Sequence, residues 1–468
     1  MTDVVIIGGG PAGYEAALVA RDQGADVVIL DEAGMGGSCV LYDCVPSKTF
    51  IASTGVRTEL RRAENLGFNI DNVEHLLRPS TLQQINCRVK ELADAQSADI
   101  HDKLAEQGIR VLIGRGEIAD KQPGLAAHEV LATVNGRTER LRADVVLIAT
   151  GSSPRTLPNA QPDGERILTW RQIYDLQTPP EHLVVIGSGV TGAEFVHAYT
   201  ELGVAVTAVS SRDRVLPHED QDAARVLEEV LAHRGVTIVK NAAAESVRRT
   251  KTGVRVALAD GRAVEGSHAL LTVGSVPNTT GLGLEKAGIE LTERGHIKVD
   301  RVSRTSALGI YAAGDCTGLL PLASVAGMQG RIAMYHALGE ALSPIKLRTV
   351  TSAIFTRPEI AQVGVTQKDV DSGKVQARTV SLPLATNARA KMGAIRRGFV
   401  KLFCSSGSGR VLGGVIVAPS ASELIQPIAL AVRNKLTVED VTRTFSVYPS
   451  LMGSINEAAR ILSSDDDE

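Results

Sequence analysis

The chain has 468 residues, 44 % of which are apolar, and its net charge is −3. This length exceeds what one hydrophobic core supports, so we expect several domains in a globular protein. The near-neutral charge argues against a nucleic-acid partner, and no stretch approaches the roughly 18 apolar residues of a membrane span, so we expect no integral membrane association. The first residues form an apolar strand rather than a secretion signal, so we expect a cytoplasmic protein.

The first candidate nucleotide-binding element covers residues 3–32. An apolar strand leads to Gly8, Gly10 and Gly13, an Ala-rich helix follows, and a second strand ends at Asp31. The glycines permit a tight turn and close approach to a pyrophosphate, whose charge is favoured by the helix N-terminus. Asp31 stands where a carboxylate accepts a hydrogen bond from a ribose hydroxyl. The pattern therefore predicts binding of an adenine dinucleotide.

Two cysteines follow closely in GGSCVLYDCVPSK. Cys39 and Cys44 are separated by four residues, and five cysteines in 468 residues are too few for a disulfide scaffold. In a reducing compartment such a close pair is typical of redox catalysis or of metal binding. No second Cys or His pair lies nearby at a ligand spacing, so we expect redox chemistry and no metal. We expect the remaining cysteines to be small buried apolar residues, namely Cys87, Cys316 and Cys404.

A second glycine pattern follows the first by 179 residues, at Gly187, Gly189 and Gly192. Two such elements imply two adenine dinucleotides, a bound flavin and a nicotinamide coenzyme. The second strand here ends without a carboxylate, and Ser211 and Arg212 follow it. Since a carboxylate at this place would hold a free 2′-hydroxyl and repel a 2′-phosphate, its absence favours NADPH or use of both coenzymes. The alternative is that Arg212 contacts only solvent.

Two further segments resemble crossings from a strand into a loop. One carries Thr150 and Gly151, and the other carries Asp315 directly after an apolar strand. Asp315 can accept hydrogen bonds from the ribityl hydroxyls of a flavin, or it can cap the following helix. Near the C-terminus we expect three strands, at 374–384, 398–405 and 410–419, and helices at 424–434 and after Tyr448.

The C-terminal segment SVYPSLMG places Tyr448 before a proline, and no histidine follows His336. A dithiol that exchanges with a substrate disulfide needs a group that takes up and returns protons near neutral pH. Histidine has a suitable pKa for this role and tyrosine does not.

The motifs together resemble those of the flavoprotein disulfide reductases, which include dihydrolipoamide dehydrogenase, glutathione reductase and mercuric reductase. The likeness covers essentially the whole chain, in the family's order, through GGGPAGYEAA, GGSCVLYDCVPSK, ATGSSPR, GSGVTGAEF, GSVPNTTGLGLE, IYAAGDC, FTRPEIAQVG and NARAKMG. The resemblance implies an α/β fold with two Rossmann-like dinucleotide-binding domains and an α+β C-terminal dimerisation domain. An FAD-binding domain would cover 1–151 and 275–345, an NAD(P)-binding domain 152–274, and an interface domain 346–468. The protein would be a homodimer, or a higher oligomer built from dimers.

The resemblance also implies roles for individual residues. Cys39 matches the thiol that exchanges with substrate, and Cys44 matches the thiol beside the flavin, whose thiolate forms a charge-transfer contact. Lys48 matches the lysine next to flavin N5, where a cation stabilises reduced flavin, and Glu194 matches its ion-pair partner. Val190 falls where many members carry a larger side chain that shields the nicotinamide face of the flavin, although it is equally compatible with a core position. The other positions implied for FAD or coenzyme binding are Asp31, Gly37, Ser38, Gly116, Thr150, Gly151, Gly274, Asp315 and Ala323.

Several residues depart from the family pattern. Family members place a His and a Glu, delivered by the partner subunit, where this chain has Tyr448 and Gly453. A phenol with a pKa of about 10 is a poor base near neutral pH, and loss of such a group costs roughly 10²–10⁴ in rate. Asp43 adds a negative charge that disfavours a neighbouring thiolate, and Leu41 and Tyr42 are bulkier than the usual residues.

These departures predict an FAD-dependent NAD(P)H:quinone oxidoreductase, a branch of the family known in mycobacteria. Hydride can enter through the flavin, whereas a disulfide substrate would lack its proton carrier, and quinones accept electrons without dithiol exchange. The alternatives are a disulfide or mercuric reductase that uses another base, a pyridine nucleotide transhydrogenase, and a redox-sensing flavoprotein.

Overall fold

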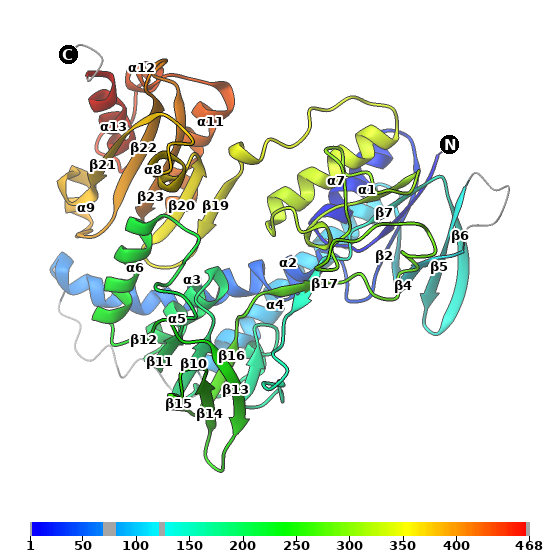
Figure 1. Ribbon diagram of the computed structural model, residues 1–468, viewed down its shortest axis with the longest axis horizontal. Coiled ribbons are helices and arrows are strands. Elements are labelled where there is room, and N and C mark those ends of the chain that lie inside the picture. The colour runs from blue at the N-terminus through cyan, green and yellow to red at the C-terminus, as the bar shows by residue number, and fades with distance from the viewer. Residues whose placement is uncertain (1, 69–80, 121–126, 465–468) are drawn as a thin grey trace. The chain divides into compact units, whose positions relative to one another are not determined.

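The structure of the protein is a computed structural model that describes residues 2–68, 81–120 and 127–464 (Figure 1). The chain divides into two compact units, each assembled from separate segments. The first consists of Met1–Thr49, Asn86–Arg155 and Gly274–Ile345, and the second of Phe50–Ile85, Thr156–Val273 and Lys346–Glu468. Two helices, α3 (Cys44–Ala63) and α4 (Thr81–Glu106), begin in one unit and end in the other.

A five-stranded parallel sheet forms the centre of the first unit. Its order is β18 (Ile310–Ala312), β7 (Val145–Ile148), β1 (Asp3–Ile7), β2 (Asp26–Asp31) and β3 (Arg110–Ile113). Because side chains alternate along a strand, Val4 and Ile6 pack on one face of the sheet while Val5 and Ile7 pack on the other. The first face is covered by α1 (Pro11–Asp22) and α7 (Ala323–Ala337), which lie side by side.

The second face of this sheet is covered by a three-stranded antiparallel sheet of β4 (Arg115–Ile118), β5 (His128–Val134) and β6 (Arg137–Ala143). The short helix α2 (Gly37–Leu41) follows β2. A two-stranded ribbon of β8 (Ser152–Pro154) and β17 (Ser275–Pro277) pairs the segments by which the chain leaves and re-enters the unit.

The second unit contains another five-stranded parallel sheet. Its order is β12 (Thr237–Val239), β11 (Ala205–Val209), β10 (His182–Ile186), β16 (His268–Leu271) and β9 (Ile167–Thr169). The helices α5 (Val190–Glu201) and α6 (Gln221–His233) connect its strands, and a three-stranded sheet of β13 (Ala244–Arg249), β14 (Val254–Leu258) and β15 (Ala263–Gly266) packs against one face. The repetition of strand, glycine turn and helix confirms the prediction of two Rossmann-like elements.

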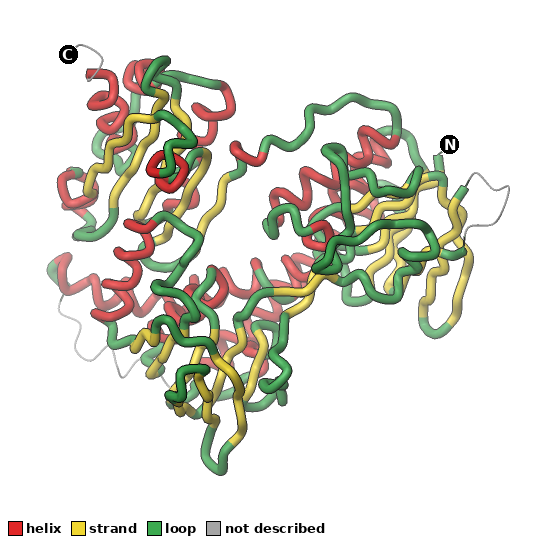
Figure 2. Tube along the Cα trace, in the orientation of Figure 1, coloured by secondary structure: helices red, strands yellow, loops and turns green. Residues whose placement is uncertain are grey.

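The C-terminal part of the second unit is an antiparallel sheet with helices packed on it (Figure 2). The strand order is β19 (Thr351–Ile354), β20 (Glu359–Gly364), β23 (Val411–Ala418), β22 (Phe399–Ser405) and β21 (Ala377–Pro383). The helices are α8 (Gln367–Asp371), α9 (Ala388–Met392), α10 (Ala421–Leu424), α11 (Gln426–Asn434), α12 (Val438–Arg443) and α13 (Gly453–Ser464). All three predicted strands and both predicted helices occur, and the α/β fold class is confirmed. Within the described residues, no helix has both the length and the apolar character needed to cross a bilayer.

Candidate functional site

The first glycine turn of the first unit forms a cradle at the N-terminus of α1. Gly8 has a φ of 114°, and a Cβ atom there would overlap the carbonyl oxygen of Ala149, whereas a Cβ on Gly13 would overlap the carbonyl oxygen of Gly8. A Cβ on Gly10 would meet only the Cα of Gly37, 4.0 Å away. The fold therefore requires the outer two glycines, and the middle one keeps an open surface.

The open surface fits the pyrophosphate of a dinucleotide. Helix α1 has no side-chain cap and no acidic residue in its first turn. Its first N–H groups are therefore free of a side-chain acceptor, and together with the helix dipole they favour a bound anion. FAD, the cofactor predicted from the sequence, fits this cradle.

Asp31 is held at the end of β2 by backbone donors. Its Oδ2 accepts a hydrogen bond from the Gly9 amide at 2.7 Å, and its Oδ1 accepts from Ala33 at 2.8 Å and from Gly34 at 3.2 Å. A carboxylate has about four acceptor positions, so Asp31 retains capacity for a ribose hydroxyl. The predicted ribose contact remains a prediction, and the structure adds a role in fixing the glycine turn.

The two cysteines lie next to each other. Cys39 is in α2, Cys44 is the first residue of α3, and both are free thiols in half-buried positions. A hydrogen bond from Cys44 lowers the pKa of Cys39, and the positive charge of Lys48 lowers it further. Burial and the Asp43 carboxylate raise this pKa, but they do not outweigh the hydrogen bond. The same hydrogen bond, followed by burial, raises the pKa of Cys44.

The hydrogen bond between the two thiols thus favours the thiolate on Cys39. The prediction that Cys44 carries the thiolate concerns the flavin-loaded protein and stays a prediction. The effect of Asp43 has the expected direction, since its carboxylate raises the pKa of both thiols.

Among the other cysteines, Cys316 and Cys404 are fully buried, as predicted. The prediction that Cys87 is buried is wrong, because this residue is exposed on α4.

The end of β18 and the loop after β7 meet beside the cradle of the first unit. The Ser152 hydroxyl donates a 2.8 Å hydrogen bond to Asp315, and burial raises the pKa of that carboxyl group. The Thr150 hydroxyl donates to the carbonyl oxygen of Asn278 at 2.6 Å, and the Asn278 amide donates back to Thr150 at 2.9 Å. Neither helical segment after β18 has a side-chain cap, so the interpretation of Asp315 as a helix cap is wrong.

Further positions predicted to bind FAD or the coenzyme also lie in the first unit. Gly116, in β4, faces Ile7, whose Cγ1 would be 3.0 Å from an added Cβ. Gly37 crosses the glycine turn so closely that an added Cβ would be 2.8 Å from the Cα of Gly10. Ser38 is half-buried in α2, and Ala323 is the first residue of α7. Gly151 and Gly274 both have positive φ and open space above the Cα.

The second glycine turn, in the second unit, repeats the geometry of the first. A Cβ on Gly187 would overlap the carbonyl oxygen of Thr272, and one on Gly192 would overlap that of Gly187, but Gly189 has no neighbour within 4 Å. Helix α5 begins at Val190 with neither a side-chain cap nor an acidic residue in its first turn. This turn therefore fits a second pyrophosphate, that of a nicotinamide coenzyme.

The end of β11 presents neutral and basic groups. Ser210 is fully buried, and its hydroxyl lies 2.7 Å from the Ser188 hydroxyl. Ser211 and Arg212 are exposed, which fits the prediction that this loop can tolerate a 2′-phosphate. Val190 is 38 % exposed in this unit, so its interpretation as a core residue is wrong.

Glu194 lies on α5 and is almost completely buried. Its Oε1 accepts a hydrogen bond from the backbone N–H of Phe355 at 2.9 Å, which fixes the carboxylate. Lys48 and Glu194 fall in different units, and their predicted ion pair stays a prediction.

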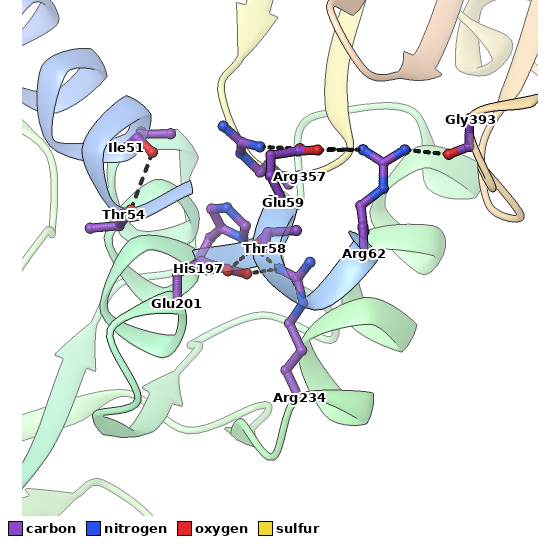
Figure 3. Close-up of polar contacts among 10 residues, drawn as sticks. All are labelled: Ile51, Thr54, Thr58, Glu59, Arg62, His197, Glu201, Arg234, Arg357 and Gly393. Carbon is purple, nitrogen blue, oxygen red and sulfur yellow. Dashed lines mark hydrogen bonds and ion pairs between the residues drawn. The ribbon is translucent and has the colours of Figure 1, made fainter. Parts of the chain in front are cut away.

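Sequence reasoning missed a buried polar cluster between α3, α5 and α6 (Figure 3). Glu201 forms a 2.5 Å ion pair with Arg234 and accepts a hydrogen bond from the Thr58 hydroxyl. Arg234 also donates to Nδ1 of His197 at 3.0 Å, and burial lowers the pKa of this histidine. Arg57 donates to the carbonyl oxygen of Glu201 at 3.0 Å. The cluster ties the helix that begins at Cys44 to the helix that begins at Val190, and the i, i+4 spacing of His197 and Glu201 was its only signal in the sequence.

The C-terminal segment that precedes α13 is exposed. Tyr448 is 85 % exposed, and Phe445 and Val447 beside it are also exposed. Gly453 begins α13, and an added Cβ would meet nothing within 4 Å. Within this chain, therefore, the phenol contributes nothing to the core.

Comparison with known proteins identifies the family of the chain. Residues 2–330 match the family model of the pyridine nucleotide-disulphide oxidoreductases, and residues 350–459 match the dimerisation domain of the same family. The chain is 64 % identical to a Mycobacterium tuberculosis protein named NAD(P)H dehydrogenase (quinone), covering 100 % of this chain and 95 % of the relative. It is 32 % identical to a dihydrolipoyl dehydrogenase of Chlorobaculum tepidum, covering 98 % and 96 % of the two chains.

Solved structures of related proteins also match the fold of this chain. The crystal structure of LpdA from Mycobacterium tuberculosis matches with a TM-score of 0.94 at 64 % identity and covers 99 % of this chain and 100 % of that chain. The HOCl-induced flavoprotein disulfide reductase RclA of Escherichia coli matches with a TM-score of 0.84 at 25 % identity, covering 98 % and 99 %. The predicted resemblance is confirmed: the chain belongs to the pyridine nucleotide-disulphide oxidoreductases, a flavoprotein family that uses FAD and NAD(P)H.

Proposed function

We propose that this protein is an FAD-dependent NAD(P)H dehydrogenase that passes electrons to quinones. The observation that carries the proposal is the C-terminal segment, where the exposed Tyr448 and Gly453 replace the His and Glu expected in disulfide reductases. The name of the relative that is 64 % identical over the whole chain, NAD(P)H dehydrogenase (quinone), supports the same function.

The chain's own residues hold the cofactors and set the charge around them. The α1 N-terminus and the open face of Gly10 hold the FAD pyrophosphate, and the α5 N-terminus and Gly189 hold that of NAD(P)H. When bound there, FAD would supply the chemistry of hydride acceptance from NAD(P)H and of two-electron transfer to the acceptor. The ammonium group of Lys48 supplies positive charge at the cysteines, as its effect on the Cys39 pKa indicates, and we assign it to stabilise the negative charge that hydride transfer brings.

The proton chemistry distinguishes quinones from disulfides. Reduction of a disulfide releases a thiolate that must be protonated by a positioned group, whereas a reduced quinone takes protons from solvent. Neither Gly453, which has no side-chain acid, nor the phenol of Tyr448 replaces the imidazole. The exposed Ser211 and Arg212 support use of NADPH, alone or together with NADH.

We assign the exposed segment around Phe445 and Tyr448, which lies within the matched dimerisation domain, to the contact surface of a homodimer. The cytoplasm is the proposed location. The domain division predicted from the sequence, with FAD at 1–151 and 275–345 and NAD(P) at 152–274, is part of the same proposal.

A second function, disulfide reduction, is favoured by one observation, the hydrogen-bonded thiol pair of Cys39 and Cys44. Steady-state oxidation of NADPH and NADH with menadione, lipoamide or no acceptor separates the two functions. We expect rapid turnover with menadione and little with lipoamide, and Cys39→Ser should leave the menadione rate nearly unchanged. Lipoamide turnover at a rate comparable to menadione, abolished by Cys39→Ser, would reject the proposal.

A gain-of-function variant tests whether the missing acid–base group is what prevents disulfide reduction. Tyr448→His combined with Gly453→Glu restores the imidazole and its orienting carboxylate, and the open space at Gly453 accepts the new side chain. We expect the lipoamide rate to rise by roughly 10²-fold or more, as general acid–base catalysis allows. Tyr448→Phe is the matched control and should change neither rate.

A further inference from the structure

Basic residues are strongly concentrated in one segment of the C-terminal sheet domain. Between Asp371 and Glu423 the chain contains eight Lys or Arg residues and no acidic residue, although the whole chain has a net charge of −3. Part of this charge is internal, because Lys401 is buried and pairs with Asp220 at 2.8 Å. Lys374 also pairs with a carboxylate, that of Asp369 at 3.0 Å, whereas four of the other cations lie on α9 or directly after it.

Helix α9 and the turn after it form a compact projection. The Gly393 amide donates to the Arg389 carbonyl at 3.1 Å, and the Ile395 amide donates to the Ala390 carbonyl at 2.8 Å, so the chain folds back on the helix. Ile395 packs on the core and anchors the turn. Four cations within nine residues remain exposed, and among the described residues none of them forms an ion pair: Arg389, Lys391, Arg396 and Arg397. We call these four residues the α9 basic surface.

The carboxylate of Glu59, which pairs with an arginine bonded to the α9 turn, does not neutralise this surface. Arg62 of α3 donates a hydrogen bond to the carbonyl oxygen of Gly393, which brings a further guanidinium group to the turn (Figure 3). Glu59 lies beside Arg62, but it is shared between Arg62 at 3.1 Å and Arg357 at 2.7 Å. Arg62 and Arg357 share the single carboxylate of Glu59, so the net charge of these three side chains is positive.

The surface also contains an exposed apolar side chain. Met392, between Lys391 and the turn, is 59 % exposed. Clustered cations around an apolar side chain are typical of proteins that bind the surface of anionic bilayers, since the cations meet lipid phosphates and the apolar group enters the interface. The segment from Arg389 to Arg397 has no aromatic side chain to stack on bases, which disfavours single-stranded nucleic acid as the partner.

We propose that the α9 basic surface docks the protein on anionic phospholipid membranes. This inference rests on the proposed function, because long-chain quinones dissolve in the bilayer and docking would bring the enzyme to its acceptor. Each cation near an anionic bilayer strengthens binding about fivefold at moderate salt, so four together contribute several hundredfold. The attraction should weaken steeply with salt, since the Debye length falls from about 8 Å at 0.15 M to about 3 Å at 1 M.

Co-sedimentation with vesicles tests the proposal. The flavin-loaded protein should bind vesicles of phosphatidylcholine with phosphatidylglycerol, release at high salt, and ignore pure phosphatidylcholine. The variant R389Q/K391Q/R396Q/R397Q should lose several hundredfold in partitioning. A matched control, R137Q/K251Q/R294Q/R301Q, removes the same charge from exposed cations scattered over the surface and should lose far less.

Activity measurements separate this proposal from the proposed function. Both quadruple variants should reduce water-soluble menadione like the parent, whereas only the α9 variant should lose activity toward a long-chain quinone embedded in anionic vesicles. Equal vesicle binding by the two variants, or retention of the parent on nucleic acid instead of vesicles, would overturn membrane docking. Failure with menadione itself would instead reject the quinone reductase proposal, whatever the vesicle result.

Discussion

The buried ion pair between Glu201 and Arg234 makes a quantitative prediction. Glu201→Gln keeps the size of the side chain and its hydrogen bond from Thr58, but it removes the negative charge that pairs with Arg234. Breaking a buried pair by removing one partner costs about 3–5 kcal/mol. Since the Arg234 side chain is 18 % exposed and Glu201 only 1 %, we expect the lower end, about 3 kcal/mol.

The matched control is Glu59, which pairs with Arg357 at 2.7 Å but is 53 % exposed. Exposed ion pairs contribute about 0–1 kcal/mol, so Glu59→Gln should cost at most about 1 kcal/mol. The two variants remove the same charge, from a buried carboxylate in one case and from an exposed carboxylate in the other.

Hydrogen exchange measured by mass spectrometry provides the assay, because it reports the opening free energy of individual helices. A loss of about 3 kcal/mol should accelerate exchange on α5 and on the C-terminal half of α3 about 100-fold in Glu201→Gln. Glu59→Gln should accelerate exchange there less than about sixfold. Similar acceleration in both variants would refute the argument that burial determines the strength of this pair.

Two further predictions concern the first unit. Gly13→Ala should prevent folding of this unit, because the added Cβ would overlap the Gly8 carbonyl oxygen. Gly10→Ala should fold, because its nearest neighbour is 4.0 Å away, but it should retain less FAD, as measured by flavin absorbance per folded chain. Normal FAD content in both variants would contradict this prediction. Asp43→Asn should lower the pKa of Cys39, because the Asp43 carboxylate raises it, so iodoacetamide should alkylate this thiol at lower pH. An unchanged or higher midpoint of the alkylation profile would show that the carboxylate has no such effect.

The parts of the fold that depend on local sequence were predictable. Each glycine turn is a short pattern in which strand, turn and helix are adjacent, and the structure contains both turns with the expected open middle glycine at Gly10 and Gly189. The C-terminal strands were predictable for the same reason, since their alternation of apolar residues extends over several positions.

Contacts between distant segments were not predictable. Ser152 and Asp315 are 163 residues apart, and Thr58 and Glu201 are 143 residues apart, so only the chain topology brings them together. The prediction for Cys87 failed for a related reason. Cysteine tends to be buried, but which face of a helix is buried depends on the partner that packs against it.

The late position of β18 in the sequence has a consequence for biosynthesis. This strand, Ile310–Ala312, completes the sheet that β1 and β2 begin, and α7, which covers α1, ends only at Ala337. A nascent chain therefore leaves the apolar side of α1 in contact with water until more than 330 residues have been translated. We therefore expect a chain that is truncated before that point to be prone to aggregation, because this apolar side of α1 stays exposed.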